Sequence, residues 1–311
     1  MFYADLHCDT LTHAKRLGER MSDNRLQTDF ARLKQAGCAF QCFAVFLRSG
    51  TAGDFSEYAS WFNEQVAENS AICAPVLSYA DLTAALNGDR LGCILTAENI
   101  GFIRSSCGVA ALSSAGVRMA SLVWNDENAL ARPNLKYVGG APDFSSREER
   151  GLTGSGMEVA EALDKAGIII DVSHLSDGGL SDLLRGRKRP LVASHSNAFA
   201  LHPVSRNLTD AQIRAIAGCG GIIGVNFCLD FLGGDDALAS ALEHIVHIVN
   251  AGGEDCAALG SDFDGMPPQR GMESCGCVPA LLNMLEKRLG ARVAEKIAAR
   301  NFMRVFKEVC G

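Results

Sequence analysis

Short apolar runs alternate along the chain with longer segments of helical periodicity. Segments such as 55–72, 155–167, 209–220 and 236–253 carry apolar residues at the spacing of an amphipathic helix. Nearly continuous apolar strands that alternate with such helices indicate a parallel sheet buried on both faces. The predicted strands are residues 2–7, 39–47, 92–97, 117–124, 167–173, 191–195, 221–227 and 257–261.

Eight strands that alternate with helices predict a (β/α)8 TIM barrel, formed as one domain by residues 1–311. A barrel of this kind is commonly a single large unit. An open, doubly wound parallel sheet is the alternative architecture. Residues 133–154, between the fourth and fifth strands, show no regular pattern. Because loops of that length are usually functional, we expect this one to fold over the mouth of the barrel.

Composition and charge exclude several classes of protein. With 48% hydrophobic and 21% charged residues, the chain can bury a sizeable core. A formal charge of −7 without a basic stripe argues against a nucleic-acid partner. No apolar run approaches membrane-spanning length, and the N-terminus shows no secretory leader. Twelve cysteines, several of them inside apolar runs, favour a reducing compartment, so we expect a cytoplasmic enzyme without a membrane partner.

Polar side chains follow the ends of most of the predicted strands. In a barrel the carboxyl ends of all strands share one face, where the active site is built. Residues i and i+2 project to the same side of a strand, so His7 and Asp9 would converge while Cys8 points away. One shared site explains the whole set more simply than separate core, rim or helix-capping roles. The set is His7, Asp9, Glu98, His174, His195 and Asp262.

The ligand types in this set indicate a metal centre. Three imidazoles with Asp9 and Glu98 exceed the protein ligands of a typical catalytic zinc site, and they suit two metal ions that share one carboxylate. Nitrogen and carboxylate ligands without thiolates favour zinc, with manganese, cobalt and iron as alternatives. A water between two such ions could attack a carbonyl carbon near neutral pH. Asp262, if it stays off the metals, could take its proton and pass it to a leaving amine.

An ordered series of motifs runs through the chain. It consists of His7-Cys8-Asp9, Glu98, DVSHLSD at 171–177, ASHSNA at 193–198, HPVSRNLTD at 202–210 and GSDFDG at 260–265. This series resembles the membrane dipeptidase (renal dipeptidase) family, the M19 metallopeptidases. The resemblance covers essentially the whole chain, up to the ARNFMRVF tail at 299–306.

The resemblance implies a binuclear zinc site. His7, Asp9 and Glu98 would bind one ion, and Glu98, His174 and His195 would bind the second. Glu98 would then bridge the two Zn²⁺ ions together with a water or hydroxide.

The resemblance also implies how a substrate is held. Arg206 would bind the substrate's carboxylate, for which a guanidinium fork is suited. Asp262 would meet the substrate's amino group and handle protons. An anion clamp and a carboxylate that together fit a short zwitterion favour dipeptides over long chains. A homodimer, the common default for soluble enzymes, is also expected by resemblance.

One position departs from the family pattern. Better-known members carry a histidine after the fourth strand, in a Leu-Thr-His-Asn context, which is thought to polarise the scissile carbonyl or to bind the tetrahedral intermediate. Here SLVWNDEN places Trp124 there, and its indole donates only one N–H. Loss of one oxyanion donor costs ~10²–10³ in rate in other enzymes. One possibility is that the zinc ions stabilise the oxyanion together with another donor, for which Asn125 is a candidate. The other is that the preferred substrate differs.

Three functions are compatible with this pattern. Arg206 and Asp262 favour a binuclear zinc dipeptidase that cleaves small dipeptides, including those with a C-terminal D-residue, which the family often tolerates. Trp124 leaves open a related amidohydrolase that acts on a non-peptide amide, an N-acyl amino acid or a lactone. A barrel that binds metal or a peptide-like ligand without turnover would lack a metal ligand or Asp262, and the chain has both.

Overall fold

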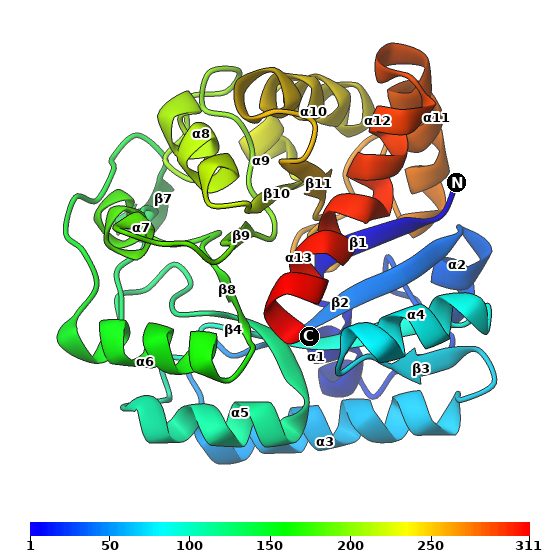
Figure 1. Ribbon diagram of the computed structural model, residues 1–311, viewed down its shortest axis with the longest axis horizontal. Coiled ribbons are helices and arrows are strands. Elements are labelled where there is room, and N and C mark those ends of the chain that lie inside the picture. Colours follow the sequence, from blue (N-terminus) through cyan, green and yellow to red (C-terminus); the bar gives the residue numbers. More distant parts are fainter.

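A nearly closed barrel of parallel strands forms the centre of the molecule (Figure 1). The computed structural model describes residues 1–311. Neighbouring barrel strands follow one another in chain order and pair in parallel, so the predicted (β/α)8 barrel is confirmed. Its strands are β1 (Tyr3–Cys8), β2 (Cys38–Phe46), β4 (Leu91–Glu98), β5 (Val117–Ser121), β8 (Ile169–Asp171), β9 (Val192–Ala193), β10 (Ile222–Val225) and β11 (Ala257–Leu259).

Each predicted strand is present, but three further strands were not predicted. β3 (Cys73–Pro75) adds to the sheet beside β4 and is too short to show a pattern. Inside the segment predicted to be irregular, β6 (Lys136–Val138) and β7 (Ala141–Asp143) form an antiparallel hairpin. Its turn is Gly139-Gly140, and both glycines have positive φ, as a tight two-residue hairpin turn requires.

Helices surround the barrel, and side-chain caps begin several of them. The hydroxyls of Thr51, Ser176 and Thr209, for example, accept backbone N–H groups of the first turns of α3, α7 and α8. The helices are α1 (Thr10–Leu17), α2 (Phe30–Gln35), α3 (Ala52–Glu68), α4 (Tyr79–Asn87), α5 (Val109–Ala115), α6 (Gly154–Lys165), α7 (Asp177–Leu184), α8 (Asp210–Gly218), α9 (Leu229–Leu232), α10 (Ala237–Gly252), α11 (Val278–Leu289), α12 (Ala291–Glu295) and α13 (Asn301–Cys310), with 3₁₀ turns at Ser106–Gly108 and Cys275–Cys277 and a π-helical turn at Lys296–Arg300. None of these helices combines the length and apolar character needed to span a membrane.

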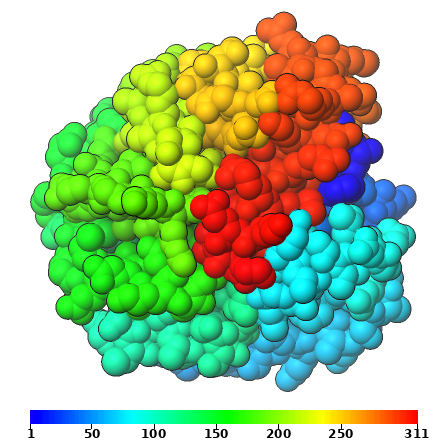
Figure 2. Space-filling view, viewed as in Figure 1, coloured from blue at the N-terminus to red at the C-terminus, as the bar shows by residue number.

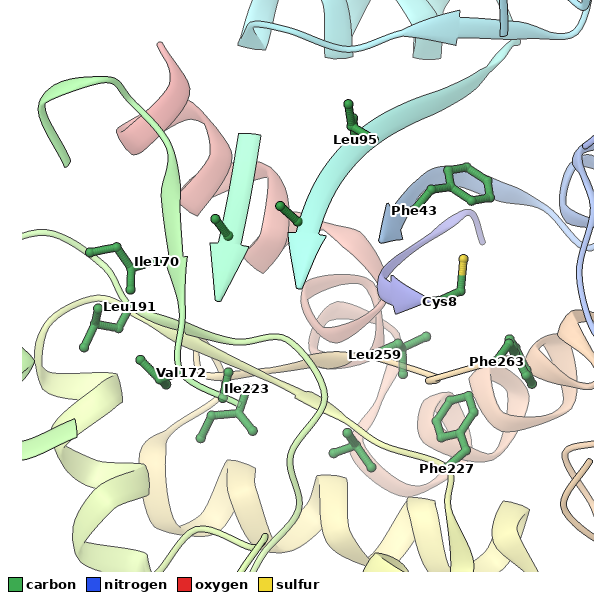
Figure 3. Close-up of a cluster of buried hydrophobic side chains, with 14 of the residues drawn as sticks. Cys8, Phe43, Leu95, Ile170, Val172, Leu191, Ile223, Phe227, Leu259 and Phe263 are labelled. Atoms are coloured by element: carbon green, nitrogen blue, oxygen red, sulfur yellow. The ribbon is translucent and has the colours of Figure 1, made fainter. Parts of the chain in front are cut away.

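The hydrophobic core has two parts. The larger cluster lies between the strands and the surrounding helices, and Figure 3 shows members such as Phe43, Leu95 and Leu259. The smaller cluster lines the inside of the barrel and includes Leu6 and Ile94 together with side chains of α13. In Figure 2 the C-terminal segment, in red, fills the middle of one face of the molecule. Helix α13 therefore closes one end of the barrel, which leaves the opposite end for polar residues.

The barrel closes between β1 and the residues that follow β11. The backbone N–H of Asp262 donates to the carbonyl of His7 (3.1 Å), and that of Asp9 donates to the carbonyl of Phe263 (2.9 Å). The buried carboxylate of Asp5 accepts hydrogen bonds from the backbone N–H (2.8 Å) and the hydroxyl (2.5 Å) of Ser261. These bonds bring the first and last polar motifs of the chain together.

We predict that the Asp5 carboxylate is needed for this closure. Asp5→Ala leaves the buried N–H of Ser261 without an acceptor and its hydroxyl with only the longer bond to the carbonyl of His7 (3.2 Å), and it should lower the free energy of unfolding by about 2–4 kcal/mol. Asp5→Asn keeps an acceptor oxygen and should cost less. Urea unfolding measures both, with Asp235→Ala as a control, because that side chain is 93% exposed. A wild-type unfolding midpoint for Asp5→Ala would contradict the prediction.

Candidate metal and catalytic site

A cavity of about 480 Å³ opens at the carboxyl ends of the strands. The segments that form it come from every part of the chain, as the parallel order of the barrel requires. Of the nine predicted site residues, seven reach its wall, and His7 and Arg206 lie behind it. The lining consists of Asp9, His13, Phe46, Glu98, Trp124, Asn125, His174, His195, Cys228, Asp230, Phe231, Asp262, Gly265, Met266, Pro267 and Gln269.

The five predicted metal ligands lie together and are buried. The two oxygens of Glu98 face different groups: Oε2 lies 3.7 Å from Nε2 of His7, and Oε1 lies 2.9 Å from Nε2 of His174 and 3.6 Å from Nε2 of His195. Asp9 Oδ2 lies 3.8 Å from Nε2 of His7. The sets His7-Asp9-Glu98 and Glu98-His174-His195 each bring potential ligand atoms within 4.8 Å of one another.

Hydrogen bonds fix which nitrogen of each histidine faces this centre. Nδ1 of His174 lies 2.8 Å from the amide oxygen of Asn125, which can only accept, so Nδ1 carries the proton. Nδ1 of His195 lies 2.7 Å from the hydroxyl of Ser194, which donates its own hydrogen to Asp171 (2.5 Å). In both rings Nε2 is therefore unprotonated and presents a lone pair.

This arrangement fits cations. The two unprotonated Nε2 atoms of His174 and His195 lie 2.9 Å apart, where their lone pairs repel unless positive charge lies beside them. Nη2 of Arg206 lies 3.2 Å from that of His174, and a metal ion would supply further positive charge. Buried atoms Nε2 of His7 and Oδ1 of Asp9 have no hydrogen-bond partner. Imidazole and carboxylate donors of this kind hold divalent metals, so the residues present fit the implied ions.

Burial and mutual charge shift the pKa values of the cluster. Burial raises the pKa of Glu98 well above its usual range, and the nearby carboxylates of Asp9 and Asp262 raise it further, against the effect of His7. Burial lowers the pKa of His7, but Glu98, Asp9 and Asp262 outweigh it and raise that pKa to about 10. Burial, with nearby cations, lowers the pKa of His174. The carboxylates of Asp9, Glu98 and Asp262 therefore favour a positive charge at the position of His7.

Asp262 is held by a turn that directs its carboxylate into the barrel. Its φ of 62° lies in the left-handed region, which aspartate tolerates better than most residues. Oδ2 accepts from the amide of Asn226 (2.9 Å), and Oδ1 lies 3.8 Å from Nε2 of His7. A Cβ at Gly265 would come within 2.3 Å of Asp262 and 2.4 Å of Asp9, so only glycine lets these carboxylates approach.

Arg206 lies behind the cavity wall rather than in it. The residue is 3% exposed, and its guanidinium packs against the ring of Phe231, with 5.6 Å from the guanidinium carbon to the ring centroid. It donates to the hydroxyl of Ser196 (3.0 Å) and the carbonyl of His195 (3.0 Å), and Nη2 lies 3.2 Å from Nε2 of His174. Nε has no partner and can donate one more hydrogen bond.

Trp124 and Asn125 occupy the wall next to His174. The Trp124 ring lies 4.9 Å from that of Phe46 and 6.1 Å from that of His174, with Arg48 stacked on it at 5.5 Å. Asn125 uses its amide oxygen to orient His174, a role the sequence did not predict. Its NH₂ group can still donate, so its part as an oxyanion donor stays a prediction.

The long segment 133–154 packs against residues beside the cavity, but none of its own residues lines the cavity. Phe144 packs on Phe231 (6.0 Å between ring centroids), and its carbonyl accepts from the backbone N–H of Ser205 (2.6 Å). Arg147 anchors the segment by two hydrogen bonds to Asp177 (2.5 and 2.7 Å). The hairpin is thus tied to the side of the site.

Sequence reasoning missed the residues that orient the ligands. Asp171 accepts from the hydroxyls of both Ser173 (2.6 Å) and Ser194 (2.5 Å), and it forms a further group of potential ligands with His7 and His195. A signal was present: a serine directly precedes each of the two strand-end histidines, His174 and His195. Asn226 is likewise missed, because nothing in its sequence neighbourhood indicates the contact with Asp262.

Comparison with known proteins identifies relatives over the length of the chain. The family model described as "Membrane dipeptidase (Peptidase family M19)" matches residues 1–310. An uncharacterized Klebsiella pneumoniae protein, from the region 5′ of pqqA, is 35% identical over 241 residues, which cover 75% of this chain and 88% of that protein. An uncharacterized dipeptidase of Schizosaccharomyces pombe is 32% identical over 235 residues, which cover 73% of this chain but 55% of that longer protein.

Solved structures share the fold. A metallopeptidase from Rhodobacter sphaeroides, liganded with a phosphinate mimic of the dipeptide L-Ala-D-Ala, superposes with a TM-score of 0.90 at 22% identity and covers 99% of both chains. The dipeptidase AC, a metallopeptidase of family M19, gives a TM-score of 0.89 at 23% identity over 100% of this chain and 99% of that one.

We predict that Ser194 positions His195 for metal binding. Ser194→Ala removes the acceptor of the His195 Nδ1 proton and the link to Asp171, so zinc affinity should fall by about 10–100-fold. Titration of metal-free protein against a chromophoric zinc chelator measures the affinity. Ser114→Ala, at an exposed position of α5, is the matched control. Unchanged zinc affinity in Ser194→Ala would show that the serine does not act through His195.

Proposed function

The chain belongs to the membrane dipeptidase family, peptidase family M19, and is a metallo-dipeptidase of that family; from this premise we propose that it hydrolyses the peptide bond of small dipeptides at a centre of two zinc ions. The observation that carries the proposal is the position of Glu98. Its two carboxylate oxygens face two separate sets of histidine ligands, as a bridging ligand must. His7 and Asp9 would complete one ion's ligands, and His174 and His195 the other's.

The ligand chemistry favours zinc. Imidazole and carboxylate ligands without a thiolate suit this ion among the borderline divalent metals. When bound, such ions polarise the scissile carbonyl and acidify the water that attacks it.

In the proposed reaction, Asp262 transfers a proton from the attacking water to the leaving amine. Its Oδ2 is held by Asn226, while Oδ1 faces the centre beside His7. The carboxylate accepts the proton released by the attacking water and delivers it to the nitrogen of the leaving amine, which breaks the peptide bond. Before that step it binds the α-amino group of the substrate, because the two carry opposite charges.

Arg206 binds the α-carboxylate at the other end of the dipeptide. Its free Nε lies on a guanidinium that is already fixed by Ser196 and the carbonyl of His195. A cavity of about 480 Å³ is large enough to hold a dipeptide. The Rhodobacter sphaeroides structure holds a mimic of L-Ala-D-Ala, which supports testing substrates with a C-terminal D-residue.

Trp124 favours one alternative. Where better-known relatives have a histidine, this chain presents an indole packed between Phe46 and Arg48. A site with one fewer polar donor suits a related amidohydrolase that acts on a non-peptide amide, an N-acyl amino acid or a lactone.

We place the protein in a reducing compartment, the cytoplasm. All twelve cysteines are free thiols, and most of them are buried. The expected homodimer stays a prediction.

The function can be tested through the proposed contact between Arg206 and the α-carboxylate of the substrate. Zinc-loaded wild-type protein should cleave L-L or L-D dipeptides, and Arg206→Ala should lower kcat/KM for them by about 100-fold, because a charge-assisted clamp is lost. For the corresponding dipeptide amides, which lack the carboxylate, the loss should be no more than about threefold. Equal losses for acid and amide would reject Arg206 as the clamp. Failure of fully metal-loaded wild type to cleave any dipeptide would favour the amidohydrolase alternative.

A further inference from the structure

One carboxylate of the cavity has no part in the proposed reaction. Four acidic side chains line the cavity: Asp9, Glu98, Asp230 and Asp262. In the proposed function the first two bind metal and Asp262 meets the amino group and the proton. Asp230 remains, at an exposed position of the wall, and it forms no ion pair with any residue of the chain.

The backbone around Asp230 is held in place. Asp230 lies in the short helix α9, directly after a segment that Asn226 ties to Asp262. The side-chain oxygen of Asn226 accepts from the N–H of Cys228 (2.7 Å), and that of Gln269 accepts from the N–H of Leu229 (2.9 Å). The backbone that carries Asp230 is therefore fixed relative to the proton-transferring Asp262.

No lysine or arginine of the chain lines the cavity to balance this charge. His13 also lines it, but Nη2 of Arg16 lies 3.2 Å from its Nδ1. Arg206, behind the wall, is engaged with Ser196 and His195.

Apolar side chains share the cavity wall with Asp230. Phe231 and Met266 are both in the lining, and they can cover the methylene stem of a long side chain. A free carboxylate next to apolar surface, without a protein cation, is suited to a flexible cationic side chain.

We infer that Asp230 selects dipeptides that carry a positively charged side chain, such as that of lysine. This specificity rests on the proposed dipeptidase function and adds the substrate class to it. The cationic side chain lies along Phe231, and its terminal ammonium binds the Asp230 carboxylate.

Matched substrates test the selection. Norleucine has the methylene chain of lysine without the ammonium, so the ratio of kcat/KM for Lys-Ala over norleucine-Ala, and for Ala-Lys over Ala-norleucine, isolates the charge. In zinc-loaded wild type at low salt, we expect a ratio of about 10 in at least one pair, since one ion pair of moderate strength gives about that factor. Asp230→Asn should bring this ratio close to 1, and about 0.5 M salt should reduce it in the wild type.

A control variant separates local from general charge effects. Asp235→Asn removes the same charge from a side chain that is 93% exposed and outside the cavity, and it should keep the wild-type ratio. Wild-type ratios near 1 in both pairs, or a ratio that survives in Asp230→Asn, would overturn the inference. If the norleucine dipeptides are not cleaved either, the proposed function itself fails, which is a different outcome.

Discussion

Three carboxylates lie buried around the imidazole of His7, and the rest of the site depends on how their charge is balanced. Oxygens of Asp9, Glu98 and Asp262 lie 3.7–3.8 Å from its Nε2. Buried carboxylates at such distances are stable only with positive charge among them. The proposed function supplies that charge as metal ions. On the other side of Glu98, the unprotonated Nε2 atoms of His174 and His195 also favour a positive charge beside them.

The fold separates the part that gives stability from the part that does chemistry. Helix α13 and the inner apolar cluster fill one end of the barrel, so polar residues can be concentrated at the other. Closure through Asp5 and Ser261 brings the two ends of the chain together, and with them His7 and Asp262. Rigid hydrogen bonds, rather than the strands alone, then set the direction of each functional side chain.

The sequence predicted the barrel and the juxtaposition of the strand-end residues, because both follow from regular patterns. Apolar runs that alternate with helices indicate parallel strands, and parallel strands place all their carboxyl ends at one face. The hairpin β6–β7 and strand β3 were missed because three-residue strands are too short to show periodicity. The Asp171–Ser194–His195 chain was missed for another reason: such contacts join different strands through side-chain geometry, which a single sequence does not display.

The bridging role of Glu98 is the central claim, and metal content tests it most directly. Wild-type protein equilibrated with zinc and then dialysed should hold two ions per chain by mass spectrometry of the metal. Glu98→Ala, which removes a ligand from both ions, should hold fewer than one, while Glu158→Ala, at an exposed position of α6, should keep two. A wild-type protein that holds one ion, or a Glu98→Ala variant that still holds two, would contradict the bridge.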